Sequence, residues 1–475
     1  MDVLEPVGMK DGLMTGDTER IADLEKRMEA LELLCIARSG MERHCLVPSA
    51  MNGEACCPAK LPPGSKCSVV CNPGYIASPG KHTATCKKDG FWTLDMECEI
   101  PLVIVSGGMI DQSKDGDSSV EVLSLYPSKG CDRQIPDMPL ADGSHRTLHN
   151  LIFLPHDRIL ACNGLTNKHK GRDRWDKPAY KASCDVWSLK TNAWKHHSYP
   201  NQGSSGEESL CSYGEDSSSY YCNHPEREKG RYASEAVHVG GETYLLGGMV
   251  YDDSGHDPTK SGRSLYEPDM TGMGLRYAEN YWKNDRKVMD RRRAFFCAAK
   301  VKEGGALMMG GLGKNKSGTV VEKSVQFLSR GRGIGGLSKH SNVSDMSIPR
   351  SGHGCTAIPG GEVSVLVTGG TQGFGAAAMA DAEIFSWNSN SWKNVTSMKL
   401  GRFGHAVVAL GERVFAIGGD DRNQKNMDTI EEYDVRRNTW NIIKQKPKKP
   451  RSNFGFTLVP HSIFDGCTIE KPLNE

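Results

Sequence analysis

Residues Arg402–Gly419 read RFGHAVVALGERVFAIGG, which is two apolar, β-rich segments joined by a tight turn. The turn is Gly411-Glu412-Arg413, and the second apolar segment ends in a glycine pair. Two short apolar segments on either side of a glycine-containing turn predict a β-hairpin.

The same pattern recurs along the chain. Each copy has a basic residue, an apolar segment, a turn, a second apolar segment and then Gly-Gly or Asn-Gly. The other complete copies begin at Arg146, Arg231, Arg292 and Arg350. Two half copies, 102–108 (LVIVSGG) and 451–460 (RSNFGFTLVP), each supply the half that the other lacks. Self-similarity at a period of roughly 50 residues indicates a propeller or an array of repeats.

Most glycine pairs are followed by a polar strand that closes on tryptophan. These tryptophans are Trp194, Trp392 and Trp440. The units resemble kelch repeats, and the resemblance implies one four-stranded blade for each unit. The pairs that mark the units are Gly107-Gly108, Asn163-Gly164, Gly247-Gly248, Gly310-Gly311, Gly369-Gly370 and Gly418-Gly419.

We therefore expect an all-β chain whose residues 102–460 form a six-bladed propeller. The C-terminal strand, 453–460, is expected to pair with residues 103–106 and close the ring, because a closed ring leaves no end blade uncovered. The glycines are expected to have positive φ or to allow close backbone approach. The alternative is a set of unrelated hairpins in a β-sandwich. Residues 461–475 are predicted to be a C-terminal tail.

The N-terminal segment has two parts. Residues 1–16 show no periodicity and are predicted to be disordered, without the apolar core of a signal peptide. In residues 17–38, apolar side chains recur at three- and four-residue steps, which predicts a short amphipathic or coiled-coil helix. They are Ile21, Leu24, Met28, Leu31 and Cys35. Two interpretations stay open: a weak homo-oligomer formed through these residues, or a helix that packs on its own chain.

Residues 45–98 contain seven cysteines, a density that indicates a disulfide scaffold or a metal site. Zinc is disfavoured, because no pair of CxxC motifs is present and His82 is the sole histidine of the segment. The order of cysteines, with Asn72-Pro73-Gly74-Tyr75 and Gly90-Phe91-Trp92, resembles a sushi (complement control protein) module. The resemblance implies the disulfides Cys45–Cys86 and Cys71–Cys98 with Trp92 between them. Cys67 is expected to pair with Cys57 or with its neighbour Cys56.

Further cysteines lie in the predicted propeller. Cys162 and Cys184 would face each other across an antiparallel pair and are expected to form a disulfide, and Cys211 and Cys222 are expected to close a local loop. The pairing of four others is not determined by the sequence, and two of these, Cys297 and Cys355, are interpreted as buried thiols at equivalent positions. The remaining two are Cys131 and Cys467.

Disulfides persist in oxidising compartments, so the sushi-like module predicts an extracellular protein, secreted or at the cell surface. The signal peptide would then be missing from this sequence. Three sequons, at Asn315, Asn342 and Asn394, are predicted in turns or loops and are candidate glycosylation sites.

The charge balance does not indicate nucleic acid or a membrane surface, because 59 Lys+Arg against 58 Asp+Glu give a net charge of +1. No apolar run approaches the ~18 residues of a spanning helix. Two basic runs, 286–293 and 444–451, are interpreted as charged loops or as sites for a glycosaminoglycan or acidic protein. An acidic stretch is interpreted as a solvated loop in preference to a calcium site. Its carboxylates are Asp252, Asp253, Asp257 and Asp269.

No catalytic motif is found, and neither catalysis nor a cofactor is predicted. The predicted function is binding or adhesion outside the cell, with a protein or glycan held by the sushi-like module and by propeller loops. The insertions 201–230 and 251–291 are the candidate loops. One alternative is an intracellular kelch scaffold or ubiquitin-ligase adaptor. A second is a copper enzyme related to galactose oxidase, which also uses a kelch-like propeller.

Overall fold

The computed structural model describes residues 44–470 with internal gaps. The gaps are 59, 111–116, 132–133, 139–144, 155–157, 168, 171–173, 176–178, 181–182, 199–230, 240–241, 252–265, 269–273, 279–280, 286–288, 292, 302–304, 316–317, 331–336, 341, 361–363, 374, 422 and 424. The described residues form two compact units, 44–69 with 80–97 and 70–79 with 98–470. The predicted disordered segment 1–16 and the predicted helix 17–38 lie outside the described residues.

The first unit and the adjoining residues of the second are built from short strands. These are β1 (Cys45–Leu46), β2 (Ala50–Met51), β3 (Gly53–Cys56), β4 (Lys60–Leu61), β5 (Lys66–Cys71), β6 (Ile76–Ala77), β7 (Thr83–Thr85) and β8 (Met96–Glu99). The core of the first unit is small: Cys67, Ala84 and Met96 are fully buried, and Trp92 packs on them while half-buried. A core of this size makes covalent crosslinks important for stability.

In the second unit, the described residues contain five four-stranded antiparallel sheets. Within each sheet, the strands are given in the order in which they pair. The first two sheets are β13 (Asn150–Leu154), β14 (Arg158–Cys162), β19 (Ser183–Ser188) and β20 (Ala193–Ser198), and β22 (Glu235–Val239), β23 (Glu242–Leu246), β26 (Gly274–Ala278) and β27 (Tyr281–Asp285). The other three are β28 (Cys297–Val301), β29 (Gly305–Met309), β32 (Val325–Arg330) and β33 (Leu337–His340); β34 (Gly354–Ala357), β35 (Ser364–Thr368), β36 (Ala382–Ser386) and β37 (Ser391–Val395); and β38 (Ala406–Leu410), β39 (Arg413–Ile417), β40 (Ile430–Asp434) and β41 (Thr439–Ile442). Each sheet contains one copy of the repeated hairpin.

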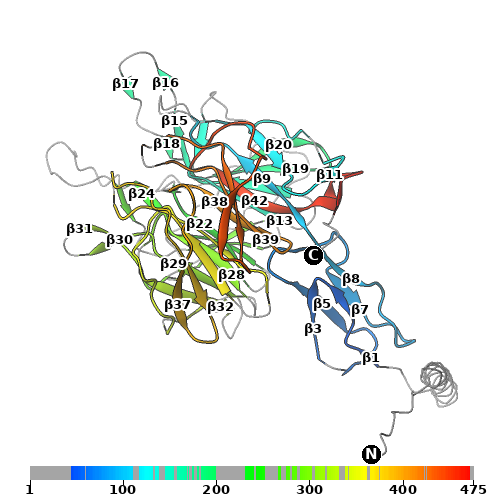
Figure 1. The fold of residues 1–475 in the computed structure, drawn as a ribbon. Coiled ribbons are helices and arrows are strands. Elements are labelled where there is room, and N and C mark those ends of the chain that lie inside the picture. Colours follow the sequence, from blue (N-terminus) through cyan, green and yellow to red (C-terminus); the bar gives the residue numbers. More distant parts are fainter. Residues whose placement is uncertain are drawn as a thin grey trace, which may run out of the picture. The chain divides into compact units, whose positions relative to one another are not determined.

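A further sheet joins the two ends of the second unit. Strand β9 (Pro101–Ser106) lies between β10 (Val120–Leu123) and β42 (Gly455–Pro460), and all pairs are antiparallel. The register pairs Gly455 with Ser106 and Val459 with Leu102. Figure 1 shows the red β42 beside the blue β9, which confirms the predicted pairing of the two half copies.

The described residues of the second unit also form smaller sheets of two or three strands. They are β11 (Ser128–Lys129) with β43 (Thr468–Ile469); β12 (His145–Thr147), β15 (Leu165–Asn167) and β18 (Ala179–Tyr180); β16 (His169–Lys170) with β17 (Arg174–Trp175); β21 (Arg231–Tyr232), β24 (Met249–Tyr251) and β25 (Tyr266–Pro268); and β30 (Leu312–Asn315) with β31 (Gly318–Val321).

A closed cycle of backbone hydrogen bonds connects the six sheets. The residue two positions before each innermost strand donates its N–H to the carbonyl oxygen of its counterpart in the next sheet around the cycle, at 2.8–3.0 Å. The cycle runs Leu148, Asn453, Gly404, Gly352, Phe295, Ala233 and back to Leu148. All six residues have φ between 51° and 61°. Because an L-residue with a side chain is strained there, the ring requires a backbone conformation and not one residue type.

The glycine pairs join neighbouring sheets. The pairs have positive φ, as predicted. In five of them, the second glycine donates its N–H to the carbonyl oxygen of the arginine near the start of the next hairpin; these are Gly108, Gly248, Gly311, Gly370 and Gly419. For example, Gly370 N donates to Arg402 O at 2.8 Å. A Cβ added at Gly369 would lie 2.4 Å from the same carbonyl oxygen, so a larger residue would separate the sheets.

Five arginines near the starts of the repeated hairpins are buried with hydrogen-bonding partners: Arg146, Arg293, Arg350, Arg402 and Arg451. Arg402 donates to the carbonyl oxygen of Gly418 at 2.7 Å and forms an ion pair with Glu431 at 3.0 Å; both side chains are fully buried. Arg350 does the same with Gly369 and Glu383. In these two hairpins, the arginine therefore connects the glycine turn to the third strand of its own sheet.

Two features differ from the sequence expectations. Residues 461–470, predicted as part of a tail, fold back: His461–Ile463 form the 3-10 helix η2, Phe464 is buried, and β43 pairs with β11. Cys467 is bonded to Cys131, so this segment is fixed covalently.

Cys297 and Cys355 also form a disulfide, so the interpretation as buried thiols was wrong. They lie on β28 and β34, the innermost strands of successive sheets, whose apolar faces meet.

Candidate binding surface

Few large apolar side chains are exposed in the described part of the chain. They are Leu46 (68% exposed), Val47 (46%), Met51 (60%), Phe91 (61%) and Ile442 (52%). Four of these five belong to the first unit, although it contributes a small share of the described residues. Scattered exposed apolar residues are ordinary, but a concentration of them marks an interaction surface.

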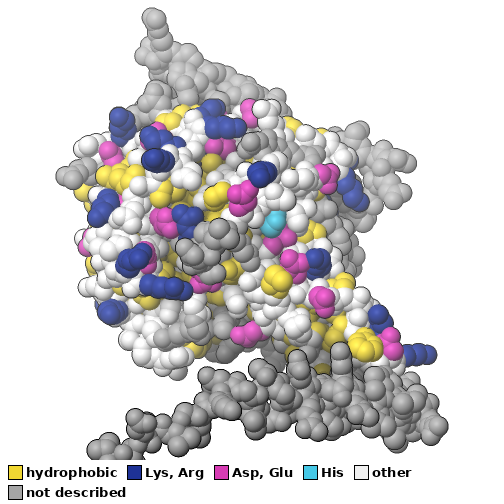
Figure 2. All heavy atoms as spheres, turned by 45° about the vertical axis from the view of Figure 1, so that its right-hand side comes forward, with side chains coloured by type: hydrophobic (Ala, Val, Ile, Leu, Met, Phe, Trp, Pro, Cys, Tyr) yellow, Lys and Arg dark blue, Asp and Glu magenta, His cyan; other side chains and the backbone are white. Residues whose placement is uncertain are grey.

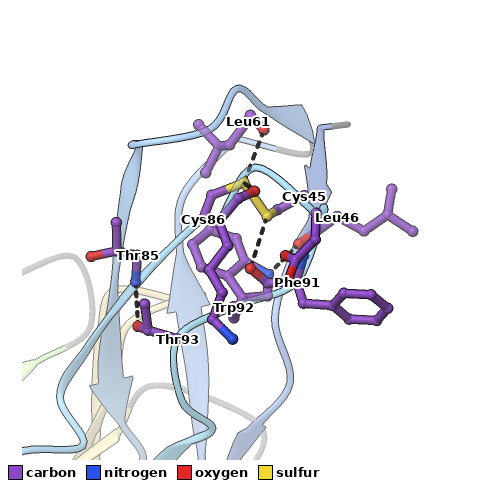
Figure 3. The surroundings of a disulfide bond; sticks show 10 residues. Cys45, Leu46, Leu61, Thr85, Cys86, Phe91, Trp92 and Thr93 are labelled. Carbon is purple, nitrogen blue, oxygen red and sulfur yellow. Dashed lines mark hydrogen bonds between the residues drawn. A yellow bond between two sulfur atoms is a disulfide. The ribbon is translucent and has the colours of Figure 1, made fainter. Parts of the chain in front are cut away.

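Leu46, Val47 and Phe91 form the group that we call the Leu46 patch. Leu46 is on β1, which pairs with β4, and the preceding residue Cys45 is bonded to Cys86. The indole N–H of Trp92 donates to the carbonyl oxygen of Leu46 at 2.7 Å. Figure 3 shows the side chains of Leu46 and Phe91 pointing away from the disulfide on the same side. The disulfide and the Trp92 bond thus hold two apolar side chains next to each other in solvent.

A tight turn presents Phe91. Gly90 N donates to Lys87 O at 3.1 Å, and Lys87 N donates to Phe91 O at 2.8 Å, which closes the turn. The Asp89 carboxylate accepts from Phe91 N at 3.0 Å. The backbone on both sides of Phe91 is therefore fixed, and its ring remains in solvent while the adjacent Trp92 packs inward. Fixed apolar groups lose little conformational entropy when a partner covers them.

The predicted cysteines of the sushi-like module are placed as follows. Cys45 is bonded to Cys86, Cys57 to Cys67, and Cys71 to Cys98. Cys56 is a free and exposed thiol. The sequence left open which member of the Cys56-Cys57 pair is bridged, and the structure assigns it to Cys57.

In the second unit, Cys162 and Cys184 are directly opposite in the β14–β19 register and are bonded. The predicted Cys211–Cys222 pair, the insertion 201–230 and most of 251–291 lie outside the described residues. The four aspartates of the interpreted acidic loop lie outside them as well.

The three sequon asparagines have different environments. Asn315 is the last residue of β30, and Asn394 lies within β37, so these two are in strands and not in the predicted turns or loops. Both strands lie at sheet edges. Asn342 is outside a strand, and Asn342 and Asn394 are exposed.

Asn342 and Asn394 occupy the same register in successive sheets. The residue two positions after each, Ser344 or Thr396, accepts a hydrogen bond from a tryptophan of the next sheet: Trp392 Nε1 to Ser344 O is 2.8 Å, and Trp440 Nε1 to Thr396 O is 2.9 Å. The sequon hydroxyl residues thus form part of the joint between sheets, while the asparagines point outward.

The basic runs are largely neutralised. In the second run, Lys446 pairs with Asp428 at 2.9 Å, Lys449 pairs with Asp117 at 3.1 Å, and Arg451 is buried near the same aspartate. In the described part of the first run, Arg293 is buried and Arg291 pairs with Glu322 at 3.5 Å. Figure 2 shows basic and acidic side chains intermixed on the face drawn. These contacts favour the interpretation as charged loops.

The buried histidines of the repeat have lowered pKa values. Burial, followed by the charge of Arg350, lowers the pKa of His353 to about 3. Burial and neighbouring arginines hold the pKa of His149 and of His405 well below the ordinary value. His405 Nε2 lies 2.9 Å from Thr368 Oγ1, and His149 Nε2 lies 2.8 Å from Ser106 Oγ. These histidines are neutral structural groups that pack under the glycine pairs.

Over the described ranges, no group of three His, Cys, Asp or Glu side chains is arranged to hold a metal ion. Within the same residues, no helix has the length and apolar character needed to cross a membrane.

Comparison with known families matches two segments. The family described as Sushi repeat (SCR repeat) matches residues 45–98, and the family described as Kelch motif matches residues 401–447. A sushi repeat and a kelch motif are both present in this chain. The kelch motif coincides with the sheet β38–β41 and the sequence RFGHAVVALGERVFAIGG, and the sushi repeat begins and ends at bonded cysteines.

Curated relatives include two kelch-like proteins. The chain is 40% identical over 68 residues to Kelch-like protein 35 of Mus musculus, covering 14% of this chain and 12% of the relative. It is 25% identical over 217 residues to Kelch-like protein 34 of Homo sapiens, covering 44% and 31%. It is 27% identical over 135 residues to Beta-scruin of Limulus polyphemus, covering 26% and 14%. The chain thus spans less than a third of each of these relatives.

Among solved structures, a chain titled "Structure of YjhT" aligns with 73% of this chain and 98% of its own length, at 13% identity and a TM-score of 0.48.

Proposed function

We propose that this chain is an extracellular binding protein, in which a sushi repeat and a six-bladed kelch propeller present surfaces for contact with another protein or a glycan. Kelch and sushi modules are both associated with protein binding, which supports a binding function. The proposal includes the division of the chain into a sushi module, 45–98, and a propeller, 102–460. The closed cycle of hydrogen bonds among six sheets supports the blade number.

The observation that carries the extracellular assignment is the set of six disulfides in the described residues. These disulfides span from 10 to 336 residues and occur in both compact units, and disulfides persist in an oxidising compartment. The small core of the first unit supports the same assignment, because a module of this size depends on its crosslinks.

The experiment is peptide mass mapping of the natural protein with and without reduction. We expect Cys45–Cys86, Cys71–Cys98 and Cys131–Cys467 as crosslinked peptides without reduction. Free thiols at these six positions in protein isolated under alkylating conditions would contradict the extracellular proposal.

We also propose that Asn342 and Asn394 carry N-linked glycans, since both are exposed at equivalent positions. Treatment with a glycosidase that removes N-linked glycans, followed by peptide mapping, tests this. Unmodified asparagine at both sites in secreted protein would contradict it.

The second candidate function is that of an intracellular kelch scaffold. It is favoured by the similarity of 44% of this chain to a human kelch-like protein. It predicts reduced cysteines, so the same mass mapping distinguishes the two functions.

A further inference from the structure

We propose that the Leu46 patch is covered by the apolar side of residues 17–38 of the same chain. This docking would make the patch an intramolecular binding site for an amphipathic segment. It rests on the proposed function in one respect, because it needs the oxidised sushi repeat that holds Leu46 and Phe91 in place.

The chemistry of the patch selects an apolar occupant. Leu46 and Phe91 are each more than half exposed, and Val47 continues the surface along the chain. The polar groups beside them are already used: Leu46 O accepts from Trp92, and Phe91 N donates to Asp89. Lys60 is opposite Leu46 in the β1–β4 register, Lys87 N donates to Phe91 O, and both lysines are exposed. The patch therefore suits an amphipathic occupant, whose apolar side chains would remove hydrocarbon from water.

The position of the chain selects the occupant further. The described chain begins at His44, and Cys45 is fixed by the β1–β4 pairing and by its disulfide. Residues 39–43 connect this fixed point to residue 38, and a fully extended chain from residue 38 to His44 reaches at most about 22 Å. The tether therefore limits how far the C-terminal end of the segment 17–38 can lie from the patch.

The segment has the complementary pattern. Ile21, Leu24, Met28 and Leu31 recur at three- and four-residue steps, which places them on one side of a helix. Charged residues fill the intervening positions. An apolar stripe of this kind is the occupant that a flat apolar patch accepts in helix recognition.

Docking within one chain is favoured over pairing with a second copy. A helix of two to three heptads forms only a marginal coiled coil. A short tether, in contrast, gives an effective concentration on the order of millimolar, which exceeds the concentration of a second copy in dilute solution. Docking within one chain should therefore not depend on protein concentration, whereas pairing with a second copy should weaken on dilution.

The test is amide hydrogen exchange of the full chain, followed by mass spectrometry of peptides from 17–38. The variants are Phe91→Asp in the patch and Leu24→Asp in the segment. The control is Ile442→Asp, which adds the same charge at an exposed apolar site of the second unit. Phe91 and Ile442 are exposed, so neither substitution removes a core side chain.

We expect exchange in 17–38 to be about tenfold faster in Phe91→Asp and in Leu24→Asp than in the unmodified chain. Ile442→Asp should leave it unchanged, and a hundredfold dilution of the unmodified chain should also leave it unchanged. Exchange that is equally fast in the unmodified chain and in Phe91→Asp would overturn the docking. Protection that disappears on dilution would assign the segment to a second copy and overturn it as well.

Intact mass before exchange separates this inference from the proposed function. Free thiols at Cys45 and Cys86 would count against the extracellular assignment. Intact disulfides together with an unprotected 17–38 segment would count against the docking alone.

Discussion

The two compact units solve the same stability problem by different means. The first unit has a buried cluster of only Cys67, Ala84 and Met96, and it has two disulfides of its own, Cys45–Cys86 and Cys57–Cys67. The second unit has larger apolar clusters between its sheets, such as the one that contains Phe415 and Ile417, and fully buried ion pairs. The difference teaches that disulfides contribute most of the stability where a unit has little apolar surface to bury. Where sheets can cover one another, packing and buried ion pairs contribute most of it.

The largest effect should come from breaking a buried ion pair of the second unit. In Glu431→Ala, the Arg402 guanidinium keeps its burial but loses its carboxylate, and the N–H groups of Lys399 and Leu400 lose their acceptor. We expect a loss of about 3–5 kcal/mol in the free energy of unfolding. Denaturant unfolding followed by tryptophan fluorescence measures it. The control Asp434→Ala removes an exposed pair with Arg437 and should leave the midpoint unchanged. Equal effects of the two substitutions would contradict the interpretation.

The next effect should come from removing a crosslink of the first unit. We expect the double variant Cys45→Ser, Cys86→Ser to lose about 2–5 kcal/mol, enough to unfold residues 44–69 and 80–97 while the second unit stays folded. Limited proteolysis with peptide mapping locates the unfolded part. The matched control is Cys162→Ser, Cys184→Ser, whose sheet keeps a core that includes Leu160 and Leu245. Cleavage confined to the second unit in the first variant would reverse the comparison.

A moderate effect should follow from acidification. His353 has an ordinary pKa of 6.5 when unfolded and about 3 when folded, so the unfolded chain binds the extra proton first. Stability should fall as pH drops below about 6.5 and level off below about 3, with a loss of about 2 kcal/mol at pH 5 from this residue. Unfolding curves at pH 7, 6 and 5 test it.

The matched variant for the acid effect is His353→Phe, because Phe296 and Phe454 occupy the equivalent position in two other hairpins. This variant should unfold with a smaller dependence on pH. An unchanged dependence would show that His353 is not the titrating group.

The smallest effect should come from the hydrogen-bonded ring. In Gly352→Ala, a Cβ has no neighbour closer than 3.6 Å, so the cost is the strain of positive φ alone, about 1 kcal/mol. In Gly404→Ala, the Cβ would lie 2.5 Å from Asn453 Oδ1, and the loss should be larger. Thermal unfolding of both variants provides the comparison. A larger loss for Gly352→Ala would mean that crowding does not decide the difference.

Some of this architecture could be predicted from the sequence. The hairpins and the β9–β42 pairing follow from apolar segments and positive-φ glycines, which act locally. The facing of Cys162 and Cys184 follows from their strand register. The hydrogen-bonded cycle that connects the six sheets could not be predicted. Its members, such as Leu148, Phe295 and Gly404, share a backbone conformation but have chemically different side chains.

The disulfide between Cys131 and Cys467 could not be predicted from the sequence either. Cys131 and Cys467 are 336 residues apart and meet only after the ends of the second unit come together. The exposure of Phe91 could not be predicted from the sequence either, because its neighbour Trp92 is also aromatic and yet packs inward. Whether an aromatic residue is covered depends on tertiary packing and not on its own type.

The hydrogen-bonded ring also has an electrical consequence. Each peptide group carries a dipole of about 3.5 D, and in a helix these add along one axis to give charged ends. In the cycle through Leu148, Gly352 and Asn453, the donor-to-acceptor directions follow a closed circuit. Vectors laid head to tail around a circuit sum to nearly zero in its plane. The hydrogen-bonded ring thus joins the six sheets without a net dipole in its own plane.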